Sequence, residues 1–421
     1  MENVPFLWPL CVSRHIPPPR QPLPPITSTL PPFLIDISRL IYRRLTGTLP
    51  TGIDRVGLEY IRHYGPQSRA VLCLGPFSAL LSDKDSSTVF RALLVPDVSM
   101  RWMAIWLIVK AFFTHWITHR LNGTFLFNTS HTGLESPNYA WLLRRMGTRT
   151  IVVIHDLIPI THPEYCRHGE YETHIVRMRC AVRVGAGLVA NSQHTLADLQ
   201  AFCQKQDLTC PPAIAALLAP ALPDIAPGGR PMAAPYFVVL STIEPRKNHW
   251  MLLQLWRRLV ETMGTSAPNL VVIGKRGWEC ENVVDLLERC IPLRGVVIEK
   301  TACSDAELIT LLHHSRALLF PSFAEGYGLP VTEALSLGVP VIASELPVFR
   351  ETIDDVPDYA DPLDGKRWEA LIRDYTQPES ALRTAQIGRM KQFRQTTWAQ
   401  HFEQVDALLG SLDERAGAKG L

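Results

Sequence analysis

Two glutamates beside a glycine-containing loop are the residues best suited to chemistry. Glu325 lies on the loop, which follows an apolar run of strand length, and Glu333 lies on the helix expected next. A glycine loop at a helix N-terminus exposes backbone N–H groups that suit a phosphate, so the amides of Gly326, Tyr327 and Gly328 are expected to cradle a diphosphate. Carboxylates accept hydrogen bonds from vicinal hydroxyls, so one glutamate is expected to hold a sugar and the other a ribose.

A second group of candidate residues follows the expected strand 236–241. Arg246 and Lys247 are predicted to open the next helix, at the carboxyl edge of a sheet, where ligands bind in such folds. A guanidinium and an ammonium there would neutralise a diphosphate. Adjacent basic residues on their own are more typical of a solvated surface, and it is the glycine loop in the same half of the chain that favours the phosphate role.

Together these residues resemble the retaining glycosyltransferases of family four, of the bacterial polysaccharide type also called glycosyl transferases group 1. The resemblance rests on the Glu-x7-Glu spacing of Glu325 and Glu333, on Glu-Pro-Arg-Lys-Asn at 244–248 and on the run 338–343. It covers roughly residues 33–410 and is strongest over 236–352. It implies that Glu325 contacts the donor sugar, that Glu333 holds the nucleotide ribose, and that the two basic residues stabilise the leaving diphosphate.

The resemblance extends more weakly into the first half of the chain. His155 ends an apolar run at 151–155 and resembles the histidine that reaches the donor sugar from the opposite domain; a hydrogen-bonded core histidine is the competing interpretation. The segment 51–56 takes the place of the family's glycine-rich first loop. It has one glycine, Gly52, where many relatives have two, so its contact with a donor phosphate is an open question.

The elements that must position these residues alternate between strands and helices along the chain. This alternation predicts parallel sheets covered by helices on both faces. The segment 223–235, with four prolines and two glycines, is the expected domain boundary. The expected strands are 33–38, 70–74, 124–128, 150–155 and 187–191 in the first half and 236–241, 270–274, 296–299, 317–320 and 339–343 in the second.

The predicted fold class is α/β in the GT-B arrangement, with two Rossmann-like doubly wound domains facing an interdomain cleft. The expected organisation is a proline-rich lead-in at 1–32, an acceptor domain at 33–222, a linker at 223–235, a nucleotide-sugar domain at 236–395 and a C-terminal helix at 396–421 that packs back on the first domain. Asp83 and Asp85 match the letters of a metal-binding DxD motif, but they are expected in a polar loop and are discounted.

The composition of the chain argues against several classes of protein. The chain has 421 residues, 47% of them hydrophobic, and a formal charge of +2, which offers no global footprint for nucleic acid. Nine cysteines without a CxxC pair argue against a zinc ribbon or a disulfide framework and favour a reducing cytoplasm. The first residues lack the features of a signal peptide.

The apolar run 103–117 is too short to span a bilayer and contains Lys110. With the tryptophans and basic residues of 101–120, it is expected either to lie on an anionic membrane surface or to form a core helix. The expected location is therefore the cytoplasm, with peripheral association at the inner membrane face as one option.

The resemblance implies transfer of a hexose without a metal or other cofactor, with mannose from GDP-mannose as the expected donor. The expected acceptor is lipid-linked or a growing polysaccharide, and the lipid part of this expectation rests on the tryptophans and arginines of 101–120. Three alternatives stay open: a glycoside hydrolase that uses the two glutamates, a sugar-nucleotide epimerase of the same architecture, and a non-catalytic nucleotide-sugar-binding partner subunit.

Overall fold

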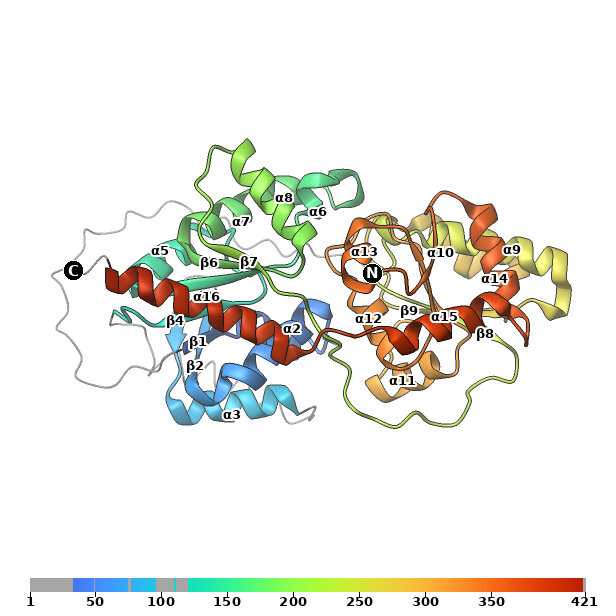
Figure 1. Ribbon diagram of the computed structural model, residues 1–421, viewed down its shortest axis with the longest axis horizontal. Helices are drawn as coiled ribbons and strands as arrows, with labels where there is room; N and C mark the ends of the chain where they lie inside the picture. The colour runs from blue at the N-terminus through green and yellow to red at the C-terminus, as the bar shows by residue number, and fades with distance from the viewer. Residues whose placement is uncertain (1–32, 49, 75–76, 96–109, 111–119, 419–421) are drawn as a thin grey trace.

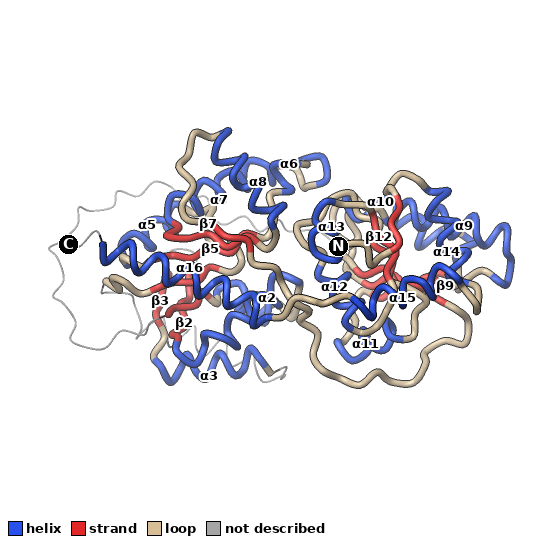
Figure 2. The backbone as a smooth tube through the Cα atoms, viewed as in Figure 1, coloured by secondary structure: helices blue, strands red, loops and turns tan. Residues whose placement is uncertain are grey.

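The computed structural model describes residues 33–48, 50–74, 77–95, 110 and 120–418. The expected lead-in and nearly all of 101–120 lie outside these residues. Figure 2 shows two separate sheets, each enclosed by helices. The expectation of an α/β protein with two doubly wound parallel sheets is confirmed. No helix in the described ranges is long and apolar enough to cross a membrane.

The first sheet has the strand order β3-β2-β1-β4-β5-β6-β7 within the described residues. All neighbouring strands are parallel except β3, which pairs antiparallel with β2. The strands are β1 Phe33–Asp36, β2 Ser68–Leu74, β3 Phe77–Leu80, β4 Phe125–Asn128, β5 Arg149–Ile154, β6 Gly185–Ala190 and β7 Ala213–Ala215. The helices are α1 Ser38–Leu45, α2 Gly52–Tyr64, α3 Asp83–Leu94, α5 Pro137–Met146, α6 Ile158–Thr161, α7 Glu170–Val184 and α8 Gln193–Lys205.

The second sheet is parallel throughout, in the order β10-β9-β8-β11-β12-β13. Its strands are β8 Tyr236–Leu240, β9 Asn269–Ile273, β10 Val297–Lys300, β11 Leu318–Phe320, β12 Val341–Ser344 and β13 Asp358–Ala360. Its helices are α9 His249–Met263, α10 Glu281–Arg289, α11 Asp305–His313, α12 Leu329–Ser336, α13 Pro347–Ile353, α14 Gly365–Thr376 and α15 Ala381–Gln392.

Alternation along the central strands explains why each sheet is covered on both sides. In β5, Ile151 and Val153 belong to one core cluster, whereas Val152 and Ile154 belong to another. Successive side chains of a strand point to opposite faces, so a strand that is apolar at every position needs a helix layer on each face. The continuous apolar runs therefore dictate the layered architecture.

Three local expectations need correction. Ser38 begins α1 rather than ending the first strand, because Asp36 accepts hydrogen bonds from its backbone N–H and hydroxyl and turns the chain. Asp83 and Asp85 open α3 rather than lying in a loop, and Asp85 pairs with Lys110 at 2.8 Å. Arg246 does not open a helix: it lies in a single turn, Pro245–Lys247, that precedes α9.

The last helix, α16 (Trp398–Ala418), returns from the second domain and packs on β6 and β7 of the first. Phe402, 3% exposed, stacks on His63 with ring centroids 4.0 Å apart and contacts the edge of Tyr60. His401 contacts the Tyr60 hydroxyl through Nε2 at 3.1 Å, and burial lowers its pKa to about 4. The helix is thus part of the first domain's core.

We predict that Phe402→Ala destabilises the first domain by about 3–5 kcal/mol, because the substitution leaves a cavity among aromatic rings. The urea midpoint measured by circular dichroism should fall accordingly. Leu363→Ala is the control, since Leu363 is 80% exposed. Equal midpoints for the two variants would contradict the packing described here.

Candidate functional site

The glycine loop between β11 and α12 is held in a shape that side chains would prevent. Gly328 has φ +87°, and a Cβ there would lie 2.5 Å from Phe349. A Cβ on Gly326 would lie 2.2 Å from the backbone oxygen of His155, which belongs to the first domain. One glycine therefore provides the turn into α12, and the other permits the two domains to touch.

Glu325 on this loop is joined to both candidate basic residues. Its Oε1 lies 2.5 Å from Lys247 Nζ, and its Oε2 lies 3.0 Å from Arg246 Nη1. Arg246 also contacts Glu244 at 2.9 Å and donates to the backbone oxygen of Ala324 at 2.7 Å. The structure therefore brings three of the predicted residues into one buried ion cluster, which we call the Glu325 cluster: Glu244, Arg246, Lys247 and Glu325.

Burial makes the charges of this cluster interdependent. The Glu325 side chain is only 6% exposed, and those of Lys247 and Arg246 are 11% and 18% exposed. Burial alone would raise the pKa of Glu325, but Lys247 and Arg246 outweigh it and lower that pKa to about 2. Glu325 is consequently ionised at neutral pH, and together with the Glu244 carboxylate it faces the positive charge of the two basic residues.

Backbone geometry fixes the two basic residues at the end of β8. Asn248 adopts φ +56° after the turn Pro245–Lys247, and its side chain donates to Pro362 O at 2.8 Å. The backbone N–H of Phe323 donates to Arg246 O at 2.9 Å, which ties the turn to the glycine loop. The carboxyl ends of the adjacent strands β8 and β11 thus present the cluster together.

The first domain contacts the glycine loop through hydrogen bonds and stacked rings. The hydroxyls of Ser192 and Thr195, at the N-terminus of α8, each donate to Gly326 O at 3.3 Å. The Tyr327 hydroxyl donates to Leu218 O, so this side chain serves the contact between the domains, while the ligand role predicted for Tyr327 concerns its backbone amide. Nearby, the rings of Tyr165 and Phe323 stack across the interface with centroids 5.3 Å apart.

A further contact between the domains caps α8. The Glu351 carboxylate accepts from the backbone N–H of Gln193 at 2.6 Å and of His194 at 3.0 Å. A carboxylate at a helix N-terminus satisfies unpaired donors and opposes the positive end of the helix dipole. This contact adds to those that hold the glycine loop against the first domain.

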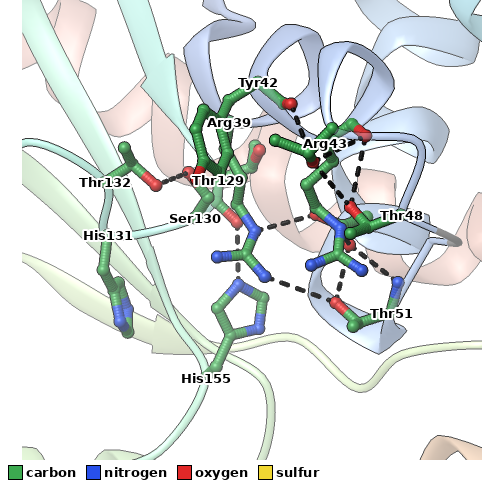
Figure 3. Close-up of polar contacts among 12 residues, drawn as sticks. Arg39, Tyr42, Arg43, Thr48, Thr51, Thr129, Ser130, His131, Thr132 and His155 are labelled. Atoms are coloured by element: carbon green, nitrogen blue, oxygen red, sulfur yellow. Dashed lines mark hydrogen bonds and ion pairs between the residues drawn. The ribbon is translucent and has the colours of Figure 1, made fainter. Parts of the chain in front are cut away.

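His155 lies on the first domain's side of the same contact. Its ring is buried, and Nε2 lies 2.7 Å from Thr129 O, so Nε2 carries the proton. Burial lowers its pKa, and the ring is neutral at pH 7. Figure 3 shows the Arg39 guanidinium between His155 and Thr51, where Arg39 Nη2 lies 3.4 Å from Thr51 Oγ1.

Gly52 meets the second domain at the start of α12. A Cβ on Gly52 would lie 3.2 Å from Leu329 Cδ1. The preceding Thr51 forms a capping box with Asp54, whose Oδ2 accepts from the Thr51 backbone N–H and hydroxyl, each at 2.7 Å. The Thr51 backbone N–H and hydroxyl are therefore already satisfied within the first domain.

Glu333 occupies a different environment from Glu325. It is 3% exposed, and its Oε1 has no hydrogen-bond partner among the described residues. Burial raises its pKa to about 7, and Arg55 opposes this rise. A buried acceptor without a partner is costly unless a ligand supplies a donor.

Two residues at the site have no role in the sequence prediction, although both lie in its motifs. Glu244 is 5% exposed and holds Arg246 from the side opposite Glu325. Arg55 follows Gly52 in the segment 51–56; it donates to Ala221 O and pairs with Asp305 of the second domain at 2.6 Å. The signal for Glu244 was its place beside Arg246, whereas no sequence signal pairs Arg55 with Glu333.

Sequence comparisons with known proteins match part of this chain. Residues 224–358 match the family described as Glycosyl transferases group 1. Serotype-specific mannosyltransferase WbdA of Escherichia coli is 28% identical over 239 residues, covering 53% of this chain and 29% of the relative. O-antigen chain mannosyltransferase B of Escherichia coli is 34% identical over 163 residues, covering 39% and 42%. The alignments thus span less than half the length of these relatives.

Solved structures resemble the chain over nearly its whole length. Anabaena HepE in complex with UDP and glucose superposes with a TM-score of 0.63 at 14% identity, covering 90% of this chain and 99% of that one. Sucrose-phosphate synthase from Thermosynechococcus elongatus gives 0.61 at 14%, covering 91% and 99%. The chain therefore has the GT-B fold, and its residues 224–358 are similar to the glycosyl transferases group 1 family.

Proposed function

We propose that the chain is a retaining glycosyltransferase that moves mannose from GDP-mannose to a lipid-linked or polysaccharide acceptor. The match to glycosyl transferases group 1 supports transfer of a sugar, and the names of the two Escherichia coli relatives support mannose and a polysaccharide product. The proposed location is the cytoplasm, at the inner membrane face, where such an acceptor would be presented. No metal or other cofactor is invoked.

The Glu325 cluster is the observation that carries this proposal. Two cations and two carboxylates are buried together, and one of the carboxylates, Glu325, lies on a loop that the other domain contacts. A donor diphosphate would bring negative charge to Arg246 and Lys247 and replace Glu325 as their partner. Glu325 would then be free to accept hydrogen bonds from the hydroxyls of the sugar.

The charges of the site suit stabilisation of a dissociating donor. As the bond to the diphosphate breaks, positive charge develops on the sugar and negative charge on the leaving group. In the site without a donor, Lys247 and Arg246 lower the pKa of Glu325 to about 2, so the sugar would meet an ionised carboxylate, which is a good electrostatic partner for its positive charge. Arg246, Lys247 and the loop amides would receive the diphosphate.

Retention of configuration needs no nucleophile from the protein in this scheme. The acceptor hydroxyl attacks on the face from which the diphosphate departs, and its proton passes to a diphosphate oxygen. His155 is neutral, with Nε2 donating to Thr129 O, so its proposed role is to line the sugar side of the site from the first domain.

The open acceptor on Glu333 is the proposed ribose contact. A ribose hydroxyl donating to the unpartnered Oε1 would satisfy the atom and favour the ionised carboxylate. Arg55 beside it would stabilise the same charged form.

Glu325→Gln should lower kcat for GDP release from GDP-mannose by at least about 100-fold, because the neutral amide cannot stabilise positive charge on the sugar. Lys247→Ala should lower it comparably. Turnover is followed by coupled detection of GDP with an acceptor present. Glu288→Gln, which changes an exposed ion pair in the same domain, is the control. Turnover at the native rate by both site variants would contradict the roles proposed for Glu325 and Lys247. Activity without any nucleotide would favour the alternative of a glycoside hydrolase.

Glu333→Gln should change how stability depends on pH. The folded-state pKa of about 7 lies above the ordinary glutamate pKa of 4.5, so the folded protein binds the proton more tightly than the unfolded chain does. Native stability should therefore fall as pH rises from about 4.5 to about 7, by up to about 3 kcal/mol, and the glutamine variant should escape this loss. Urea unfolding across this range checks the slope.

Nucleotide binding provides a second readout of Glu333. If the ribose donates to this carboxylate, GDP binding should release protons from the native protein near pH 7, and Glu333→Gln should lack that release. Calorimetry in two buffers of different ionisation enthalpy measures it. Identical proton release by the native chain and Glu333→Gln would contradict the proposed contact between Glu333 and the ribose.

The base of the donor can be tested by ligand-induced stabilisation. A ligand that binds the native state raises Tm, and at equal concentration a tighter ligand raises it more, so GDP should raise Tm more than UDP or ADP. A larger shift with UDP would contradict the assignment of GDP-mannose while leaving sugar transfer in place.

A further inference from the structure

The face of the first domain formed by α5 and α7 carries a groove outside the proposed catalytic site. The groove has a volume of about 250 Å³. Leu134, Ala140, Val176 and Val184 give it an apolar lining. Arg144, Arg179 and Arg183 line it with cationic side chains. Figure 1 shows α5 at the end of the first domain that lies away from the second domain.

The arginines of this face lack acidic partners. None of Arg144, Arg145, Arg179 and Arg183 forms an ion pair with a carboxylate in the described part of the chain. Arg179 donates through Nε to Gln206 Oε1 at 2.9 Å, and Arg145 lies over the Trp141 ring at 5.1 Å. Glu135, the acidic residue that lines the groove, is already engaged by Arg177 at 3.1 Å.

A local excess of four guanidinium groups stands out on a protein whose net charge is only +2. Such a patch attracts an anionic partner over about one Debye length. Unpaired arginines suit phosphate in particular, because the planar guanidinium donates two parallel hydrogen bonds to its oxygens.

Large apolar side chains are exposed beside these charges. Trp141 and Val176 are each 46% exposed, Trp141 on α5 and Val176 on α7. Tryptophan next to basic residues is typical of protein segments at the boundary between water and lipid. A nucleic acid would meet the same charge, but it has no group that would fill an apolar groove.

We propose that the α5–α7 groove binds an anionic phospholipid at a membrane surface, with its phosphate on Arg144 and Arg183 and part of an acyl chain in the groove. Trp141 would lie at the lipid–water boundary. This site would hold the protein beside a lipid-linked acceptor, but it does not depend on the proposed sugar transfer.

Vesicle flotation of the full chain tests the proposal. The protein should float with vesicles of phosphatidylcholine containing about one third phosphatidylglycerol, and much less with phosphatidylcholine alone. Arg144→Gln with Arg183→Gln should weaken binding by about 25-fold, at about fivefold for each arginine near an anionic surface. High salt should weaken native binding in the same direction.

A matched variant separates a specific site from general loss of charge. Arg257→Gln with Arg289→Gln removes the same charge from exposed helix positions of the second domain and should leave vesicle binding unchanged. Circular dichroism and Tm confirm that each variant is folded. Native-like flotation of the Arg144/Arg183 variant, or equal losses in both double variants, would overturn the proposal.

The groove itself is tested with Ala140→Phe, which fills it and keeps every charge. This variant should bind monomeric dihexanoyl-phosphatidylglycerol at least about fivefold more weakly than the native protein, and inorganic phosphate alone should not compete at equal concentration. Unchanged binding by Ala140→Phe, or displacement by phosphate, would overturn the acyl-chain part of the site. Because neither assay uses a donor sugar, their outcome is independent of the outcome of the turnover assay.

Discussion

The contact of one buried carboxylate with two cations organises the candidate site. Glu325 is held by Arg246 and Lys247 where burial would otherwise disfavour its charge. Such a cluster is stable only while its charges balance, because an unpaired buried ion costs several kcal/mol. A ligand that brings negative charge to the cations must therefore provide Glu325 with new hydrogen-bond donors. A glycosyl diphosphate does both with one molecule.

The parallel sheets explain why this cluster lies between the domains. The glycine loop follows β11, the basic turn follows β8, and His155 follows β5 of the other sheet. Each therefore emerges from the carboxyl end of a buried strand, the edge at which doubly wound sheets bind ligands. Gly326 then lets the edges meet, since any side chain there would collide with His155 O.

The sheets and their helix layers are predictable from the sequence because buried parallel strands need unbroken apolar runs. The proximity of Glu325 to Arg246 and Lys247 is predictable because the adjacent strands β8 and β11 have their carboxyl ends at the same edge of the sheet. Other features depend on geometry that no local pattern encodes. The turn at Pro245–Lys247 depends on Asn248 adopting a left-handed conformation. The apolar spacing that predicts a helix does not reveal such a turn. Arg55 reaches Asp305 and the surroundings of Glu333 only after the domains have docked.

The most direct test of this account is calorimetric titration of GDP into the native chain, Lys247→Met and Glu325→Gln. The account predicts that Lys247→Met binds GDP at least about tenfold more weakly than the native chain, because it loses a buried charge-assisted contact with phosphate. Glu325→Gln should bind GDP as tightly as the native chain or more tightly, because Arg246 and Lys247 are no longer paired with the Glu325 carboxylate. Native affinity in the lysine variant, or a parallel loss in both, would contradict it.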